Sequence, residues 1–234
     1  DTIRREGVTQ AMVVPTMLAR VVHELDGKPA DVPTLRSLSY GGSKMPLPVL
    51  EQALELFEGV GFVNAYGLTE TSSTIALLGP DDHAAAFAGD PDAKRRLGSV
   101  GKLLPGIEVE VRDEDDNVLP VGEPGLVFLR GEQISGEYDQ GSVIDADGWF
   151  PTKDRGWVDA DGYLFIEGRA DDTIIRGGEN IAPAEIEEVL IRHDDIVDAA
   201  VVGLPDEEWG QSIAAVVVAR QGVELTSAEV QAFC

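Results

Sequence analysis

Short apolar runs alternate with amphipathic segments through the first part of the chain, and this alternation limits the fold more than any other feature of the sequence. Each apolar run has the length of a buried strand, and the amphipathic segments carry a proline at their start, as many helices do. The strand-like runs are 11–14, 35–40 and 61–66, and the helix-like segments are 15–25 and 46–57. Strands that alternate with helices predict an α/β fold with a parallel sheet, in which ligands bind beyond the carboxyl ends of the strands.

The first amphipathic segment, which opens at Pro15, is predicted to bury one apolar face. The residues of that face are Met17, Leu18, Val21, Val22 and Leu25. Their spacing of three or four residues places them along one side of a helix. Residues 79–97, in contrast, show no clear period, and we expect a surface loop with one helical turn there.

A second pattern begins at residue 98, where short runs of alternating polarity are separated by polar turns. This pattern predicts a small antiparallel, barrel-like unit over residues 98–168. The acidic run 113–116 is better explained as a hairpin turn than as a calcium site, because it lacks the alternate-position ligands of a calcium loop.

A third pattern occupies residues 169–234 and predicts a compact α+β unit. Its expected elements are a strand at 173–175, a helix at 183–192 and strands at 197–202 and 213–219. Thr226 and Glu229 then form a capping-box pattern, which indicates the start of another helix.

The chain carries 43 acidic and 18 basic residues, for a formal net charge of −25. A chain of this charge is not expected to bind nucleic acid or an anionic membrane surface. The single cysteine, Cys234, cannot form an intrachain disulfide, and the composition fits a reducing, cytoplasmic setting. The sequence contains no run of about 18 apolar residues, so it predicts no membrane span. The sequence leaves open whether the protein forms a homo-oligomer.

Two local motifs have more than one interpretation when they are taken from the residues alone. Gly177 and Gly178 precede a helix that Pro183 opens, which fits an ordinary strand–turn–helix corner as well as a loop that lets backbone approach a ligand. The polar stretch from Tyr66 to Glu70 is, by the same reasoning, more simply a capped turn than a binding site.

Four stretches in a fixed order nevertheless point to a family. They are Tyr40–Ser43 (YGGS), Asn64–Glu70 (NAYGLTE), Thr152–Asp154 (TKD) and Gly168–Glu187 (GRADDTIIRGGENIAPAEIE). Because the four occur together and in order, chance is a poor explanation for them. The chain resembles the adenylate-forming, or AMP-binding, enzymes, and its Gly178–Pro183 stretch is similar to the acyl-CoA synthetase branch.

The resemblance implies how the chain is divided. Residues 1–168 would be the C-terminal part of a large AMP-binding domain, with an α/β part at 1–97 and a β-barrel part at 98–168. Residues 169–234 would begin a mobile, truncated α+β C-terminal domain. Since the family's phosphate loop lies upstream of these segments and its adenylation lysine downstream, we expect an internal or C-terminal fragment that is inactive by itself.

The resemblance also implies an activity. The parent would be an ATP-dependent acyl-CoA synthetase: a carboxylic acid attacks ATP to give acyl-adenylate and pyrophosphate, and coenzyme A then displaces AMP. ATP, Mg²⁺ and coenzyme A are the implied cofactors and co-substrates. The apolar residues within 72–78 favour a fatty or other hydrophobic acid. Two alternatives are a ligase or adenylation domain that loads a carrier protein, and a non-catalytic nucleotide-binding module.

Site residues follow from the resemblance position by position. Thr69 and Glu70 would act in catalysis, Glu70 as the Mg²⁺ ligand, and Asp171 would be the hinge between the two half-reactions. Tyr66 would face adenine, and Asp154 and Arg169 would reach the ribose. The full set of implied nucleotide and coenzyme A contacts is Gly41, Gly42, Ser43, Asn64, Ala65, Tyr66, Gly67, Thr69, Asp154, Arg169, Gly177, Gly178 and Glu179.

Two positions depart from the family pattern. Ser43 stands where the family more often has alanine, which is a small change. Lys153 stands where the family usually has glycine, and a side chain is acceptable there if it points to solvent.

Overall fold

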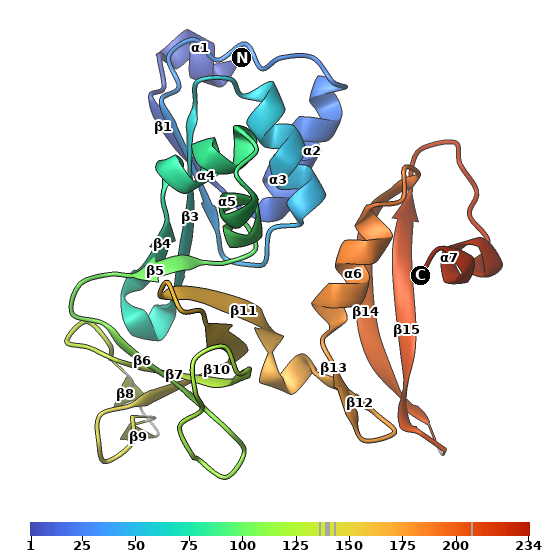
Figure 1. Ribbon diagram of the computed structural model, residues 1–234. Coiled ribbons are helices and arrows are strands. Elements are labelled where there is room, and N and C mark those ends of the chain that lie inside the picture. The colour runs from blue at the N-terminus through green and yellow to red at the C-terminus, as the bar shows by residue number, and fades with distance from the viewer. Residues whose placement is uncertain (136, 139–140, 143, 207) are drawn as a thin grey trace. The chain divides into compact units, whose positions relative to one another are not determined.

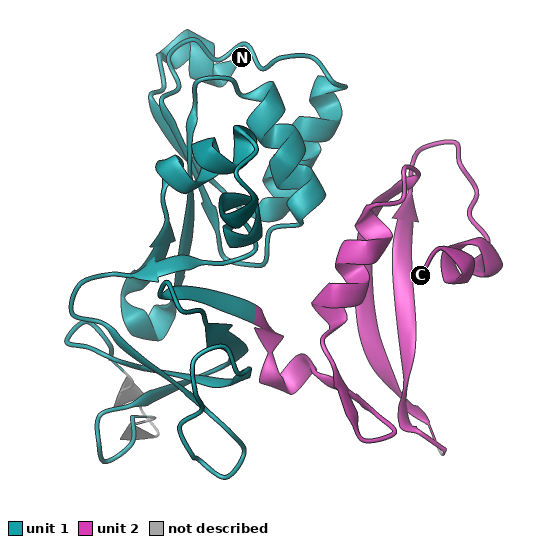
Figure 2. Ribbon diagram, viewed as in Figure 1, with its two compact units in different colours: residues 1–166 teal, residues 167–234 magenta. Residues whose placement is uncertain are grey.

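The computed structural model describes residues 1–135, 137–138, 141–142, 144–206 and 208–234. The chain forms two compact units, Asp1–Ile166 and Glu167–Cys234 (Figure 2). The first unit holds a nine-stranded sheet, and the second holds a helix packed on a long hairpin.

The first three strands of the large sheet are parallel, as the alternating pattern predicts. They are β1 (Gln10–Val13), β2 (Ser37–Gly41) and β3 (Gly61–Leu68), and the helices between them are α2 (Pro15–Leu25) and α3 (Leu47–Leu56). A short helix, α1 (Thr2–Glu6), precedes β1. Figure 1 shows α2 and α3 lying to one side of the strands.

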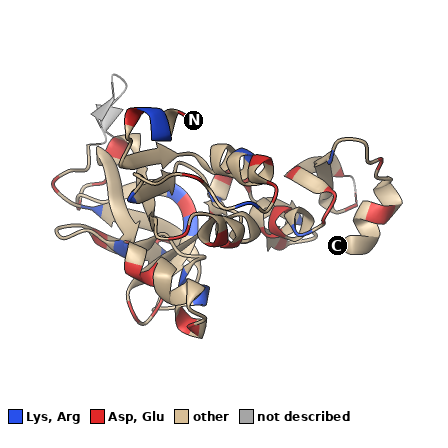
Figure 3. Ribbon diagram, turned by 90° about the horizontal axis from the view of Figure 1, so that it is seen from above, with Lys and Arg blue, Asp and Glu red and all other residues tan. Residues whose placement is uncertain are grey.

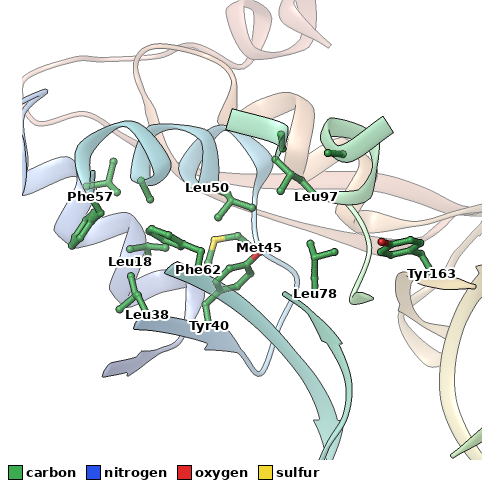
Figure 4. Close-up of a cluster of buried hydrophobic side chains, with 14 of the residues drawn as sticks. Leu18, Leu38, Tyr40, Met45, Leu50, Phe57, Phe62, Leu78, Leu97 and Tyr163 are labelled. Carbon is green, nitrogen blue, oxygen red and sulfur yellow. The ribbon is translucent and has the colours of Figure 1, made fainter. Parts of the chain in front are cut away.

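One large core joins these helices to the sheet. Buried side chains from α2, α3, β2 and β3 belong to this single cluster, and Figure 4 shows them directed toward one another. The predicted face of α2 is only half correct, because Leu18 and Val22 are buried whereas Met17 and Val21 are 53% and 43% exposed. Since α2 packs along α3, only a narrow strip of its apolar face is covered in the described residues.

The prediction of a loop over residues 79–97 is wrong, because two short helices lie there. They are α4 (Pro80–Phe87) and α5 (Pro91–Arg96), each with proline in its first turn. Asp90 caps α5 by accepting a hydrogen bond from the Ala93 amide at 2.8 Å. Small alanines supply most of the buried face, and they give little contrast in polarity, so the helical period is hard to see in the sequence.

The antiparallel part of the first unit continues the same sheet. Its strands are β4 (Ser73–Leu78), β5 (Gly101–Leu103), β6 (Glu108–Arg112), β7 (Gly125–Arg130), β10 (Phe150–Val158) and β11 (Tyr163–Arg169). The order of strands across the sheet is β1-β2-β3-β4-β5-β11-β10-β7-β6. The short pair β8 (Glu137–Tyr138) and β9 (Gly141–Ser142) forms a separate ribbon. The acidic run forms the predicted hairpin turn, in which Asp113 accepts hydrogen bonds from the amides of Asp115 and Asn117.

A buried polar pair lies inside the first core. The Tyr40 hydroxyl donates to His83 Nε2 at 2.8 Å, and His83 Nδ1 donates to the Gly79 carbonyl at 2.7 Å. Because a carbonyl only accepts hydrogen bonds, Nδ1 carries a proton, and in the neutral imidazole Nε2 is then the acceptor for the Tyr40 hydroxyl. Burial lowers the pKa of His83, although the Gly79 bond and the nearby Asp82 oppose that shift, and burial raises the pKa of Tyr40.

Strand β10 contains a backbone irregularity next to Asp154. Its pairing with β7 shifts register between Pro151 and Arg155, and within this bulge the exposed Lys153 has a φ of 62°. That φ lies in the left-handed region, which glycine enters at the least cost. The geometry therefore explains why a glycine fits this position and why lysine is strained there.

The second unit matches the predicted α+β pattern. Its elements are η2 (Ala170–Asp172), β12 (Ile174–Arg176), β13 (Glu179–Ile181), α6 (Pro183–Ile191), β14 (Ile196–Asp206), β15 (Gly210–Ala219) and α7 (Ser227–Phe233). Leu190 of α6 packs with Ile174, Ile196 and Val201 in a small core. The predicted capping box is confirmed, since Thr226 accepts from the Glu229 amide and the Glu229 carboxylate accepts from the Thr226 amide.

Acidic residues are distributed over both units (Figure 3), in keeping with the net charge of −25. Within the described part of the chain, no helix has both the length and the apolar character needed to cross a membrane.

The protein should lose stability as the pH falls below the ordinary pKa of histidine, near 6.5, because the unfolded chain then takes up a proton that the buried His83 resists. The loss is complete once the pH is below the lowered pKa of the folded state. Urea unfolding between pH 7.5 and 5.5 measures it. His83→Gln should flatten this pH dependence, and His23→Gln, which removes an exposed imidazole, should not.

Lys153→Gly should raise the free energy of unfolding by roughly 0.5–1 kcal/mol, because glycine relieves the left-handed strain and offsets only part of that gain by its own flexibility. Lys153→Ala is the matched control, since it removes the charge and keeps the strain. Equal stabilisation by both variants in urea unfolding would mean that the charge, not the backbone, is responsible.

Candidate functional site

The candidate site begins at the carboxyl ends of β2 and β3. Gly41, the last residue of β2, lies opposite Ala65 in the parallel register, and Asn64 lies opposite Tyr40. The Asn64 side-chain amide donates to the Ser99 carbonyl at 3.2 Å, so a residue outside both strands holds it in place. Gly42, with φ of 91°, and the exposed Ser43 follow as the strand ends.

Close backbone packing explains two of the predicted glycines. A Cβ at Gly41 would collide with the Ala65 carbonyl, and one at Gly67 would collide with the Ser73 carbonyl. Both glycines are therefore required by the sheet itself, whatever ligand the edge binds.

One hydrogen bond joins two of the predicted site segments. The Tyr66 hydroxyl donates to Asp154 Oδ2 at 2.5 Å, although the two residues are 88 positions apart in the sequence. Asp154 is 5% exposed, and its amide donates to Thr152 Oγ1 at 3.0 Å. Thr152 in turn donates to the Val127 carbonyl at 2.8 Å, which ties the Asp154 bulge to strand β7.

This contact also requires the sheet to be curved. Strands β3 and β10 are separated by β4, β5 and β11, so they are four steps apart in the sheet order. In a flat sheet four steps correspond to about 19 Å, which a tyrosine side chain cannot cross. The sheet must therefore curl until β3 and β10 face each other, with a second apolar core, which includes Ile75, Val127 and Leu129, between the strands.

The turn after β3, residues Thr69–Ser73, carries backbone strain. Ser72 has a φ of 53° and Ser73 a φ of 91°, and each such residue costs about 1–3 kcal/mol. Thr71 is fully buried, and its hydroxyl accepts from the Leu68 amide at 2.8 Å while the Leu68 and Ser73 carbonyls lie 2.9 and 2.7 Å away. Thr71 therefore shapes the turn, which presents an exposed Thr69 and a half-buried Glu70.

Sequence reasoning missed both Thr71 and the partner of this turn. The partner is the segment 132–135, from which Gln133 and Ser135 donate to carbonyls of the turn. The signal for Thr71 was its position directly after the motif stretch Asn64–Glu70, whereas nothing in the sequence indicates the contact with Gln133.

The remaining predicted residues belong to the second unit and are described within it. Arg169 precedes η2, and Asp171 is exposed within this single turn, which the Thr173 amide closes on the Ala170 carbonyl at 3.2 Å. Gly177 and Gly178 form the turn between β12 and β13 with φ of 61° and 88°, as a two-residue hairpin requires. The Gly177 amide also donates to the Trp209 carbonyl at 2.9 Å. The conformation of the turn is therefore enough to account for both glycines.

The donor set at the turn limits how a metal can be held. Among the described residues, no three acidic, histidine or cysteine side chains gather into a metal site. Magnesium is commonly bound through one or two carboxylates together with substrate phosphates, so the half-buried Glu70 fits a metal that arrives with a nucleotide.

Two family models match the chain in succession. Residues 1–139 match the AMP-binding enzyme model, and residues 185–234 match the model of the AMP-binding enzyme C-terminal domain. Together they include the strand edge, the Thr69–Ser73 turn and most of the second unit.

Individual relatives agree with these models. The chain is 38% identical, over its full length and 44% of the relative, to a fatty acid–acyl-carrier-protein ligase of Streptomyces coeruleorubidus. It is 32% identical to the solved amide bond synthetase of Marinactinospora thermotolerans, with a TM-score of 0.85 over 99% of this chain and 46% of that one. It is also 32% identical to the o-succinylbenzoate coenzyme A synthetase of Bacillus subtilis, solved with its acyl-adenylate, with a TM-score of 0.80 over 100% of this chain and 45% of that one.

The chain thus spans less than half the length of the relatives that it matches. Its nine-stranded sheet and its helix-on-hairpin unit agree with parts of the N-terminal and C-terminal domains of these enzymes. With a family model that covers more than half of its residues, the chain belongs to the AMP-binding, or adenylate-forming, enzymes, and within them to the acyl-CoA ligase-like group.

Proposed function

We propose that the complete protein is an ATP-dependent acid–thiol ligase. A carboxylate oxygen attacks the α-phosphorus of ATP and pyrophosphate leaves; a thiolate then attacks the acyl carbon and AMP leaves. The observation that carries the proposal is the Tyr66–Asp154 hydrogen bond, because it brings an aromatic ring and a carboxylate from two separate motifs to one place at the sheet edge. An aromatic face beside an anchored carboxylate suits a nucleoside, whose base stacks and whose ribose hydroxyls donate.

The roles of the site residues follow from their positions. Tyr66 offers its ring to adenine, beside the backbone edge at Gly41 and Ala65. Asp154 accepts hydrogen bonds from the ribose hydroxyls, and Thr69 donates to a phosphate oxygen from its exposed position on the turn. Glu70 holds Mg²⁺ together with the phosphates, and the metal, when bound, neutralises charge that develops on the α-phosphate.

The acceptor thiol is the finer part of the proposal. The stretch Gly178–Pro183 favours coenzyme A, and the o-succinylbenzoate relative is a coenzyme A synthetase. A carrier-protein thiol is the first alternative, because one relative is a fatty acid–acyl-carrier-protein ligase. For the acid, a fatty or other hydrophobic carboxylate is supported by the fatty acid–acyl-carrier-protein ligase among the relatives. The apolar residues of β4 do not bear on this choice, because Ile75, Ala76 and Leu78 are buried in the cores of the fold.

The test is acid-dependent exchange of radiolabelled pyrophosphate into ATP by the full-length protein, across a panel of short, aromatic and long-chain acids. The proposal expects exchange with at least one hydrophobic acid and a thioester when coenzyme A is added. Binding of ATP without exchange for any acid would overturn it in favour of a nucleotide-binding module. Exchange with thioester formed only on a carrier protein would overturn the coenzyme A assignment.

Asp154→Ala in the full-length protein should weaken ATP binding by roughly ten- to a hundredfold, because hydrogen bonds to a charged acceptor are worth about 1.5–3 kcal/mol. Titration calorimetry with ATP measures the change. Asp161→Ala, in an exposed turn of the same unit, is the matched control. Unchanged affinity in Asp154→Ala would remove the ribose role.

Asp171→Pro should separate the two half-reactions, because we propose that the backbone turns at this exposed residue between them and proline fixes φ near −65°. Pyrophosphate exchange reports the first step, and conversion of supplied acyl-adenylate to thioester reports the second. One step should survive while the other is lost, and Asp171→Ala should retain both. Equal losses of both steps in a folded Asp171→Pro protein would exclude the hinge.

A further inference from the structure

The Thr69–Ser73 turn has few hydrogen bonds of its own. The Ser72 amide donates to the Thr69 carbonyl at 3.2 Å, and the other internal bonds converge on the Thr71 hydroxyl, which has a single hydrogen to share between the Leu68 and Ser73 carbonyls. The carbonyls of Glu70, Thr71 and Thr74 accept hydrogen bonds from donors elsewhere in the chain.

Those donors come from the segment 132–135, about sixty residues later in the sequence. Gln133 Nε2 donates to the Thr71 carbonyl at 2.9 Å and to the Thr74 carbonyl at 3.0 Å. The Ser135 amide donates to the Glu70 carbonyl at 2.7 Å. In return the Ser72 hydroxyl donates to the Gln133 carbonyl at 2.9 Å. Three of these hydrogen bonds hold the turn itself, and the fourth holds Thr74, the residue that follows it.

The chemistry of glutamine suits this position. A primary amide nitrogen carries two hydrogens, and here each meets one carbonyl, on either side of the strained Ser72 and Ser73. Glutamate has nearly the same shape, but its ionised carboxylate only accepts, so it would set negative oxygens against both carbonyls. Alanine would leave the carbonyls without this donor.

We infer that Gln133 is a positioning residue for the adenylation step, holding the strained turn so that Thr69 and Glu70 meet the phosphates and the metal. The inference rests on the proposed function for the roles of Thr69 and Glu70. Gln133 itself contacts neither substrate nor metal in this account. It acts through the backbone of the turn that presents them.

Two consequences separate this role from general support of the fold. The first half-reaction should suffer and its dependence on Mg²⁺ should change, because the turn carries the phosphate and metal groups. The second half-reaction, started from supplied acyl-adenylate, should keep its rate, because it no longer needs the metal-bound triphosphate. A residue that only stabilised the fold would lower both steps together.

The experiment compares Gln133→Ala, Gln133→Glu and the exposed-helix control Gln52→Ala in the full-length protein. Pyrophosphate exchange is measured over a range of Mg²⁺ concentrations, and thioester formation is measured from supplied acyl-adenylate. We expect exchange to fall by roughly tenfold or more in Gln133→Ala, since small displacements of catalytic groups cost up to about a hundredfold. The exchange rate of Gln133→Glu should fall further, and both Gln133 variants should need more Mg²⁺ for exchange. Gln52→Ala should exchange at the wild-type rate.

Glu70→Gln sets the scale for a damaged metal ligand in the same assays. Wild-type rates of exchange in both Gln133 variants would overturn the inference, as would equal losses of both half-reactions with a lowered melting temperature. If the wild-type protein shows no exchange with any acid, the proposed function fails instead. Hydrogen exchange of the peptides that cover 66–76 and 131–135 then decides the inference by itself: faster exchange in Gln133→Ala supports it, and unchanged exchange overturns it.

Discussion

The hydrogen bond between Tyr66 and Asp154 is the constraint on which the first unit depends most. It connects β3, the last parallel strand, with β10, a strand of the antiparallel part, across four steps of one continuous sheet. Such a contact exists only if the sheet curls, and the second apolar core fills the inside of that curl. The Gln133 contacts also depend on this curl of the sheet, because they join the turn after β3 to the loop after β7. The site is thus a consequence of sheet curvature.

The charge of the chain explains why the site relies on local donors. With a net charge of −25, the overall field opposes the approach of a triphosphate. In the proposed function, the attraction comes from groups that act over short distances, such as the Thr69 hydroxyl, backbone amides and a metal held at Glu70. Short-range donors are useful only when they are accurately placed, and in the proposed site that placement comes from the strained turn, which the segment 132–135 holds by hydrogen bonds to the turn and to Thr74.

Much of the fold could be predicted from the sequence because periodicity is a local signal. The parallel strands, α3, the hairpin at Asp113 and the capping box at Thr226 all follow from residues close together in the chain. The helices α4 and α5 were missed because alanine gives little contrast in polarity, and half of the α2 face was misjudged because burial depends on its neighbours. The motifs pointed to Tyr66 and Asp154 separately. Their contact, and the role of Gln133, depend on sheet curvature, which no local pattern encodes.

The measurement that tests this account most directly is a double-mutant cycle on AMP binding by the full-length protein, with Tyr66→Phe, Asp154→Ala and the combined variant. Tyr66→Phe keeps the aromatic ring and removes only the hydroxyl that donates to Asp154. If that hydroxyl acts by holding the carboxylate toward the ribose, its loss should matter only while Asp154 is present. The account therefore predicts that the combined variant binds AMP about as weakly as Asp154→Ala alone. Losses that add fully in the combined variant would show that the two residues act independently, and would contradict it.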